Sequence, residues 1–214
     1  MFTYTIDELI SRYPVLSSSK KAIEEAAEKL IASYEKGGKL LVCGNGGSCS
    51  DADHIAGELM KGFKNHRPIG EELANKINEF DPTGQIASSL QQGLPVIALH
   101  NHAGLNSAFS NDVMNGAEYV YAQQVNVYGE ANDAFLGIST SGNAKNVAAA
   151  AKVAKAKGVT VIGLTGRGGG ELGRLADTLI AVDESETFKV QELHLPIYHY
   201  LCLKVEEHFF GNKK

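Results

Sequence analysis

The chain has 214 residues, and its Asp and Glu outnumber its Lys and Arg by 25 to 20. A net charge of −5 provides no positive field that would attract a polyanion, which argues against nucleic acid as a partner. The N-terminus lacks a secretory signal, and no apolar run approaches the ~20 residues of a membrane span. We therefore expect a cytoplasmic protein that does not enter a membrane. The three cysteines lack the paired spacing of a disulfide framework and are expected to be reduced thiols.

No long Pro-, Gly- or Ser-rich linker divides the chain, so we expect a single domain over residues 1–214. Residues 1–37 predict an N-terminal helical segment of two helices, broken at Tyr13-Pro14, with Ser17–Ser19 capping the second. An apolar stripe on the second helix either covers the chain's own sheet or forms a helix bundle between subunits, and we favour oligomerisation. The stripe consists of Ile23, Ala26, Ala27, Leu30, Ile31 and Tyr34.

Five short β-rich segments follow, and each is continuously apolar, as in strands buried on both faces of a parallel sheet. Helical stretches separate them, the clearest at Ala144–Lys157, and this alternation predicts an α/β fold. Residues 64–92 are polar and rich in turn residues, so they predict a surface insertion with a helix at Glu71–Phe80. The predicted strands are Lys39–Cys43, Leu94–His100, Ala134–Ser139, Val159–Thr165 and Thr178–Val182.

Two predicted strands run into loops suited to an anion. Gly44–Ser48 has glycines that let backbone N–H groups approach a bound oxygen, and Ser139–Asn143 combines three hydroxyls with a glycine at a helix N-terminus. Without a Walker lysine, this suits a phosphate monoester better than a nucleoside triphosphate. Each loop alone could be a simple turn and cap, but both lie at the carboxyl ends of parallel strands, which favours a binding site. A further loop, Thr165–Gly170, lacks the hydroxyls and is expected only to permit tight turns.

Two predicted helices carry groups for acid–base chemistry or metal ligation. His54 and Glu58 stand four residues apart on one helical face, although such a pair is also an ordinary helix-stabilising contact. A long helix is predicted at Lys189–Phe209. Its candidate side chains are Gln191, Glu192, His194 and His199.

Periodicity leaves open which side chain of this long helix faces the site. Residues seven apart align within about 20° whereas residues eight apart differ by about 80°, so His199 aligns better with Glu192 than with Gln191. Pro196 is expected to kink the helix between them.

Taken together, these motifs resemble the phosphoheptose isomerases of the sugar isomerase (SIS) family, over essentially the whole chain apart from residues 64–92. The resemblance implies an SIS-type doubly wound sheet of five parallel strands flanked by helices, with the N-terminal helices in an oligomer bundle. It also implies a homotetramer whose active sites lie between subunits. The matching segments are Gly44–Ser48, His54 with Glu58, Phe135–Val147, Val161–Gly170 and Gln191–His199.

The same resemblance implies that the chain interconverts sedoheptulose 7-phosphate and D-glycero-D-manno-heptose 7-phosphate through an enediol. Glu58 would take the carbon-bound proton, and His199 would act on the neighbouring oxygen. One zinc ion per subunit would stabilise the enediolate, on His54, Glu58, Gln191 and His199. The implied substrate contacts are Asn45, Gly46, Gly47, Ser48, Asn111, Asp112, Ser139, Thr140, Ser141 and Gln191.

Several positions depart from the family pattern and keep another phosphosugar open as the substrate. They are Ala144, Phe188, Pro196 and His100-Asn101-His102. His102 could replace a lost polar contact, although we favour a solvated loop histidine. A different class of function is a non-catalytic SIS protein that senses a sugar phosphate or binds a protein such as a replication initiator. The retained histidine, glutamate and glutamine set argues against that alternative.

Overall fold

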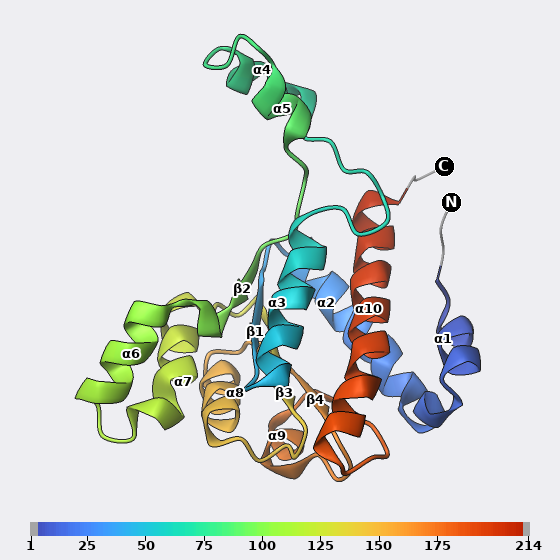
Figure 1. Ribbon diagram of the computed structural model, residues 1–214, viewed down its shortest axis with the longest axis vertical. Helices are drawn as coiled ribbons and strands as arrows, with labels where there is room; N and C mark the ends of the chain where they lie inside the picture. The colour runs from blue at the N-terminus through green and yellow to red at the C-terminus, as the bar shows by residue number, and fades with distance from the viewer. Residues whose placement is uncertain (1–3, 212–214) are drawn as a thin grey trace.

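The computed structural model describes residues 4–211, which fold around one sheet with helices on both faces (Figure 1). The five strands are all parallel and lie in the order β2-β1-β3-β4-β5. The predicted α/β fold and all five predicted strands are confirmed. The strands are β1 Leu40–Cys43, β2 Val96–Ala98, β3 Ala134–Ser139, β4 Thr160–Thr165 and β5 Thr178–Ala181.

The central strands are buried on both faces because helices cover the sheet on both sides. Along β1, Leu40 and Val42 enter one apolar cluster, whereas Leu41 and Cys43 enter the other. Every residue of β3 is buried. This explains why the strand sequences are continuously apolar rather than alternating.

The helices divide between the two faces. On one face lie α1 Ile6–Arg12, α2 Lys20–Glu35, α3 Gly47–Met60 and α10 Thr187–Phe210. Against the other face pack α6 Ala103–Asp112, α7 Gly116–Tyr128, α8 Lys145–Ala156 and α9 Gly170–Leu175. None of the helices within residues 4–211 is long and apolar enough to cross a membrane.

The N-terminal helices differ from prediction at their junction. Residues Pro14–Ser19 form the 3₁₀ helix η1, and Ser19 at the N-cap position of α2 makes no capping hydrogen bond. The predicted serine cap is therefore wrong, because the Ser19 hydroxyl donates instead to the carbonyl of Ala181 at 2.8 Å. The apolar stripe of α2 lies in the core of its own chain, which confirms that it covers its own sheet. The subunit bundle stays a prediction.

Helices α3 and α10 run side by side in the same direction (Figure 1). Near their starts, Gly47 faces Gln191. Further along, His54 lies against Tyr198. Pro196 is buried within α10, which continues from Thr187 to Phe210 despite it.

Residues 64–92, here called the arm, project away from the sheet (Figure 1). The arm carries α4 Glu71–Asn78 and α5 Gln85–Ser89, and α4 buries none of its residues. The predicted helix is confirmed, although it ends before Phe80. Because α4 is not packed against the rest of the protein, contacts at the base of the arm must set its position.

That base is held by a buried ion pair. Oε1 of Glu206 accepts hydrogen bonds from Nε and Nη2 of Arg67, at 3.0 and 2.7 Å, and from the backbone N–H of Phe63 at 2.7 Å. Oε2 accepts from the backbone N–H groups of Lys64 and Asn65. One carboxylate thus fixes both the guanidinium and the chain entering the arm.

Replacing Glu206 by Ala should destabilise the protein by about 3–5 kcal/mol, because it leaves a buried guanidinium without its counter-charge. The matched control is Glu207→Ala, since Glu207 pairs with Lys204 nearer the surface, and its loss should cost less than about 1 kcal/mol. Urea unfolding measures both. Equal losses in the two variants would contradict the anchoring role of Glu206.

His194 is a second buried polar group on α10. Its side chain is fully buried, and burial lowers its pKa to about 4. The unfolded chain, with a histidine pKa of ~6.5, therefore binds the proton more readily than the folded chain. The resulting stability is complete above about pH 6.5 and is lost as the pH falls toward 4.

Between about pH 6.5 and 4, His194 should lower the free energy of unfolding by on the order of 3 kcal/mol. This contribution should be absent in His194→Leu when urea unfolding is measured as a function of pH. The exposed His66 provides the control, and His66→Leu should keep the wild-type dependence. A wild-type slope in His194→Leu would show that other groups cause the acid sensitivity.

Candidate functional site

The two predicted phosphate loops lie side by side at the carboxyl ends of β1 and β3, which are neighbours in the sheet. Strand order reverses between these two strands, and open α/β sheets bind ligands at such a switch point. A cavity of about 420 Å³ lies there. Its lining residues are Asn45, Gly46, Gly47, Ser48, Ile138, Ser139, Thr140, Ser141, Ala144, Thr187 and Gln191.

Three helix N-termini meet at this cavity. Helix α3 begins at Gly47, α10 begins at Thr187, and Ala144 is the N-cap residue of α8. In none of the three does the N-cap side chain accept a capping hydrogen bond. None of the described residues that line the cavity is Lys or Arg. An anion bound here would be held by backbone N–H groups, helix dipoles and hydroxyls rather than by side-chain cations.

The first loop depends on two glycines and a pair of amides. Gly46 has φ 56° and ψ −124°, a conformation that residues with a side chain rarely adopt. A Cβ on Gly47 would lie 2.5 Å from Nε2 of Gln191. Asn45 exchanges two hydrogen bonds of 2.9 Å with Asn146 on α8. The sequence reasoning missed Asn146, although it lies within the matched Phe135–Val147 segment.

The second loop is supported from behind by the loop that follows β4. A Cβ on Gly142, which has φ 67°, would lie 2.0 Å from the carbonyl oxygen of Gly169. The backbone N–H of Gly166 donates to the carbonyl of Thr140 at 2.9 Å. The expectation that Thr165–Gly170 only permits tight turns is therefore wrong, because its glycines allow the two backbones to touch.

Part of the predicted acid–base set meets between α3 and α10. Nε2 of His54 lies 3.2 Å from Oε1 of Glu58, and Lys61 Nζ lies 3.3 Å from the other carboxylate oxygen. The ring centroid of His199 is 5.0 Å from that of His54. Burial, with a contribution from His54, lowers the pKa of His199 below its ordinary value. His199 is therefore neutral near pH 7 and can accept or donate a proton.

The structure decides between the two neighbouring candidates on α10. Gln191 lines the cavity, whereas Glu192 is exposed to solvent. Eight residues separate Gln191 from His199, a rise of about 12 Å along the helix. The His54–Glu58–His199 cluster therefore lies about two turns beyond the cavity along α10, and His199 lines a second hollow of about 400 Å³ rather than the cavity itself.

The four predicted metal ligands fit zinc in the kind of donor they offer, namely imidazole, carboxylate and carboxamide. Nε2 of His199 is buried and has no hydrogen-bond partner within residues 4–211, so it could bind a ligand. Within residues 4–211, no three His, Cys, Asp or Glu side chains are already gathered closely enough to hold a metal ion. The chain thus supplies suitable donor atoms, but they are not already arranged around a metal position, and the zinc ion stays a prediction.

Other predicted residues lie elsewhere. Asn111 and Asp112 are exposed at the end of α6, where they bond to each other at 2.8 Å, and they do not line the cavity. His100 Nε2 lies 2.8 Å from Asp53 Oδ2. His102 stacks on Tyr128, with ring centroids 5.6 Å apart. A substrate contact of Asn111 and Asp112 therefore stays a prediction.

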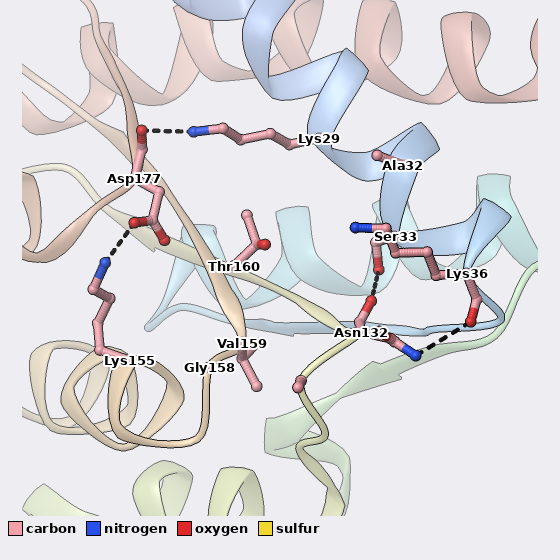
Figure 2. Close-up of a pocket in the computed structure, with 11 residues that line it drawn as sticks. Lys29, Ala32, Ser33, Lys36, Asn132, Lys155, Gly158, Val159, Thr160 and Asp177 are labelled. Atoms are coloured by element: carbon pink, nitrogen blue, oxygen red, sulfur yellow. Dashed lines mark hydrogen bonds and ion pairs between the residues drawn. The ribbon is translucent and has the colours of Figure 1, made fainter.

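A larger hollow of about 490 Å³ lies at the amino ends of β4 and β5 (Figure 2). Lys29 and Lys155 point toward Asp177, and Ser33 donates to the carbonyl of Asn132. Helices α2 and α8 end at this side, so their negative dipole ends face it and the lysines compensate for them. Its charge arrangement is the reverse of that at the phosphate loops.

The SIS domain family matches residues 2–89 and 79–166. Phosphoheptose isomerase from Aneurinibacillus thermoaerophilus is 39% identical over 193 residues, which cover 90% of this chain and 84% of that protein. The protein of the same name from Helicobacter hepaticus is 40% identical over 185 residues, with coverage of 86% and 81%.

Two solved structures are also similar. The phosphoheptose isomerase from Neisseria gonorrhoeae has a TM-score of 0.67 at 30% identity, covering 95% of this chain and 100% of its own. The one from Francisella tularensis has a TM-score of 0.72 at 28% identity, covering 96% and 100%. With the family match extending over more than half of the sequence, this chain belongs to the SIS domain family.

Proposed function

We propose that the protein is an aldose–ketose isomerase that interconverts sedoheptulose 7-phosphate and D-glycero-D-manno-heptose 7-phosphate. The observation that carries the proposal is the cavity at the switch point, together with a histidine and glutamate cluster about two turns further along α10. The names of the relatives support the same reaction. The substrate contains both parts that such a site requires, a phosphate and a carbonyl next to a carbon-bound proton.

The phosphate would bind where the helix N-termini meet, with the hydroxyls of Ser48, Ser139 and Ser141 as further partners. Binding there fixes the far end of the sugar chain, so that its carbonyl end can extend along α10 toward His199. Asn45 and Gln191 offer amides for the sugar hydroxyls. The absence of lysine from the lining suits a monoester, which carries less charge than a triphosphate.

Isomerisation moves one proton between C1 and C2 and another between the two oxygens, with no net oxidation. Glu58 is the proposed base for the carbon-bound proton, and His199 is the proposed acid and base for the oxygen-bound one. The neutral state of His199 and the free Nε2 atom suit that role. His54, Glu58, Gln191 and His199 would hold zinc, which would supply Lewis-acid stabilisation of the enediolate when bound.

We also propose that the enzyme works as a homotetramer in the cytoplasm. Asn111 and Asp112 do not line the cavity of their own chain, so a contact of this pair with substrate would require a neighbouring subunit to bring it to a site. Sedimentation of the purified protein measures the assembly.

The deciding experiment follows sedoheptulose 7-phosphate with purified protein by NMR in deuterated water, with and without added zinc. Formation of the aldose with deuterium at C2 is expected, because the enediol exchanges its proton with solvent. If neither turnover nor deuterium exchange occurs, with or without zinc, the proposed reaction is overturned. A panel of sugar phosphates in thermal-shift assays would then identify a bound ligand, since occupancy raises stability.

Glu58→Gln should lower kcat by about 10²–10⁴-fold while the fold is retained, because the amide cannot take a proton. The control is Glu192→Gln on the exposed side of α10, which should keep wild-type kinetics. Steady-state rates with sedoheptulose 7-phosphate measure both. A fully active Glu58→Gln enzyme would remove Glu58 from the mechanism.

Gly47→Ala should raise KM by up to about tenfold, because its Cβ would displace Gln191 from the cavity and remove a hydrogen bond of ~1 kcal/mol. Gly57→Ala in the same helix is the control, since its Cβ would meet nothing within 4 Å. It should leave KM unchanged and stabilise the protein by up to about 1 kcal/mol. An unchanged KM in Gly47→Ala would mean that Gln191 does not contact substrate.

A further inference from the structure

A hydrogen-bonded chain leads to His54 from the side opposite to Glu58. The hydroxyl of Tyr198 donates to Oδ1 of Asp51 at 3.3 Å, and Nδ1 of His54 lies 3.0 Å from the same hydroxyl oxygen. Tyr198 is buried, and its ring centroid is 5.4 Å from the imidazole ring. Neither Asp51 nor Tyr198 has a role in the function described so far.

The chemistry of these groups gives the chain of hydrogen bonds a direction. An ionised carboxylate can only accept hydrogen bonds, and Oδ2 of Asp51 is buried with no partner in the part of the chain that the structure describes. A tyrosine hydroxyl has one proton, so a hydroxyl that donates to Asp51 can offer only a lone pair to His54. In that arrangement Nδ1, the nitrogen that faces the hydroxyl, carries the hydrogen.

This direction determines what the other imidazole nitrogen can do. A neutral imidazole carries one N–H, so Nε2 presents a lone pair toward Oε1 of Glu58, 3.2 Å away. Two lone pairs at that distance repel, so without a metal this arrangement depends on the Asp51–Tyr198 pair that holds the hydrogen on Nδ1, and a cation between the two atoms would relieve the repulsion. We infer that Asp51 and Tyr198 are positioning residues that fix His54 as its Nδ1–H tautomer and aim the Nε2 lone pair at Glu58.

The consequence bears on the proposed acid–base and metal roles of His54 and Glu58, on which this inference rests. Without the two positioning residues, the Nε2–H tautomer would donate directly to Glu58. That hydrogen bond would occupy both the metal-binding nitrogen and the proposed base. A second partner that fixes a histidine tautomer in this way is the usual companion of a metal-ligating imidazole.

The test is ¹⁵N NMR of histidine-labelled protein, without substrate or metal, at about pH 8, where a histidine of ordinary pKa ~6.5 is neutral. Wild-type His54 should show a protonated Nδ1 and a bare Nε2. Tyr198→Phe should shift His54 to the Nε2–H tautomer. The control is Tyr200→Phe, which removes a hydroxyl from another buried tyrosine two residues along the same helix. The ring of Tyr200 lies 6.2 Å from that of Tyr4, between centroids.

Asp51→Asn provides a second variant that does not remove a ring or a hydroxyl. Its amide N–H can donate to the Tyr198 oxygen, which frees the hydroxyl proton for Nδ1 of His54 and should also raise the Nε2–H population. A wild-type His54 already in the Nε2–H form, or a Tyr198→Phe spectrum like that of Tyr200→Phe, would overturn the inference.

Zinc affinity is the second readout, measured by competition with a chelator. Tyr198→Phe should bind zinc about 10–100-fold more weakly than Tyr200→Phe. Equal affinities would overturn the inference. Because the NMR measurement uses neither substrate nor turnover, failure of the proposed isomerase reaction would leave the tautomer result unaffected.

Discussion

The site depends on the parallel packing of α3 against α10 on one face of the sheet. Along this contact, Gly47 meets Gln191, His54 meets Tyr198, and the chain leaving α3 meets Glu206. Each pair lies about two turns beyond the previous one, so a single helix contact aligns the phosphate loops, the acid–base cluster and the base of the arm. A shift of one helix along the other would disturb all three together.

The direction of the βα units explains where charge can be bound. Helices that follow parallel strands begin at the carboxyl edge of the sheet, so their positive ends gather around the cavity beside Ser48 and Ser139. At the opposite edge, helices end, and lysines such as Lys29 and Lys155 lie near their negative ends. The same backbone polarity thus accounts for a cavity without lysine or arginine in its lining at one edge and a lysine-lined hollow at the other.

Much of the site consists of groups that touch no substrate in the proposed mechanism. The loop after β4 supports Gly142 from behind, and Asn146 holds the amide of Asn45. Between α3 and α10, the hydroxyl of Tyr198 contacts the imidazole of His54. These contacts restrict the loops and the imidazole to one arrangement, which reduces the reorganisation needed when a ligand binds.

The sequence by itself determined the five strands, the two glycine- and serine-rich loops at strand ends and the position of His54 and Glu58 on one helical face, because those features follow from local apolar runs, turn residues and helical periodicity. It could not place Gln191 rather than Glu192 in the site, since their helical positions differ by only 100° and the rotation of α10 is set by its packing on α3. The support of Gly142 by Gly169, the Asn45–Asn146 pair and the contact of Tyr198 with Asp51 and His54 were decided only by the tertiary structure. They join residues 27–147 positions apart, and no local pattern specifies which distant side chains or backbones will meet.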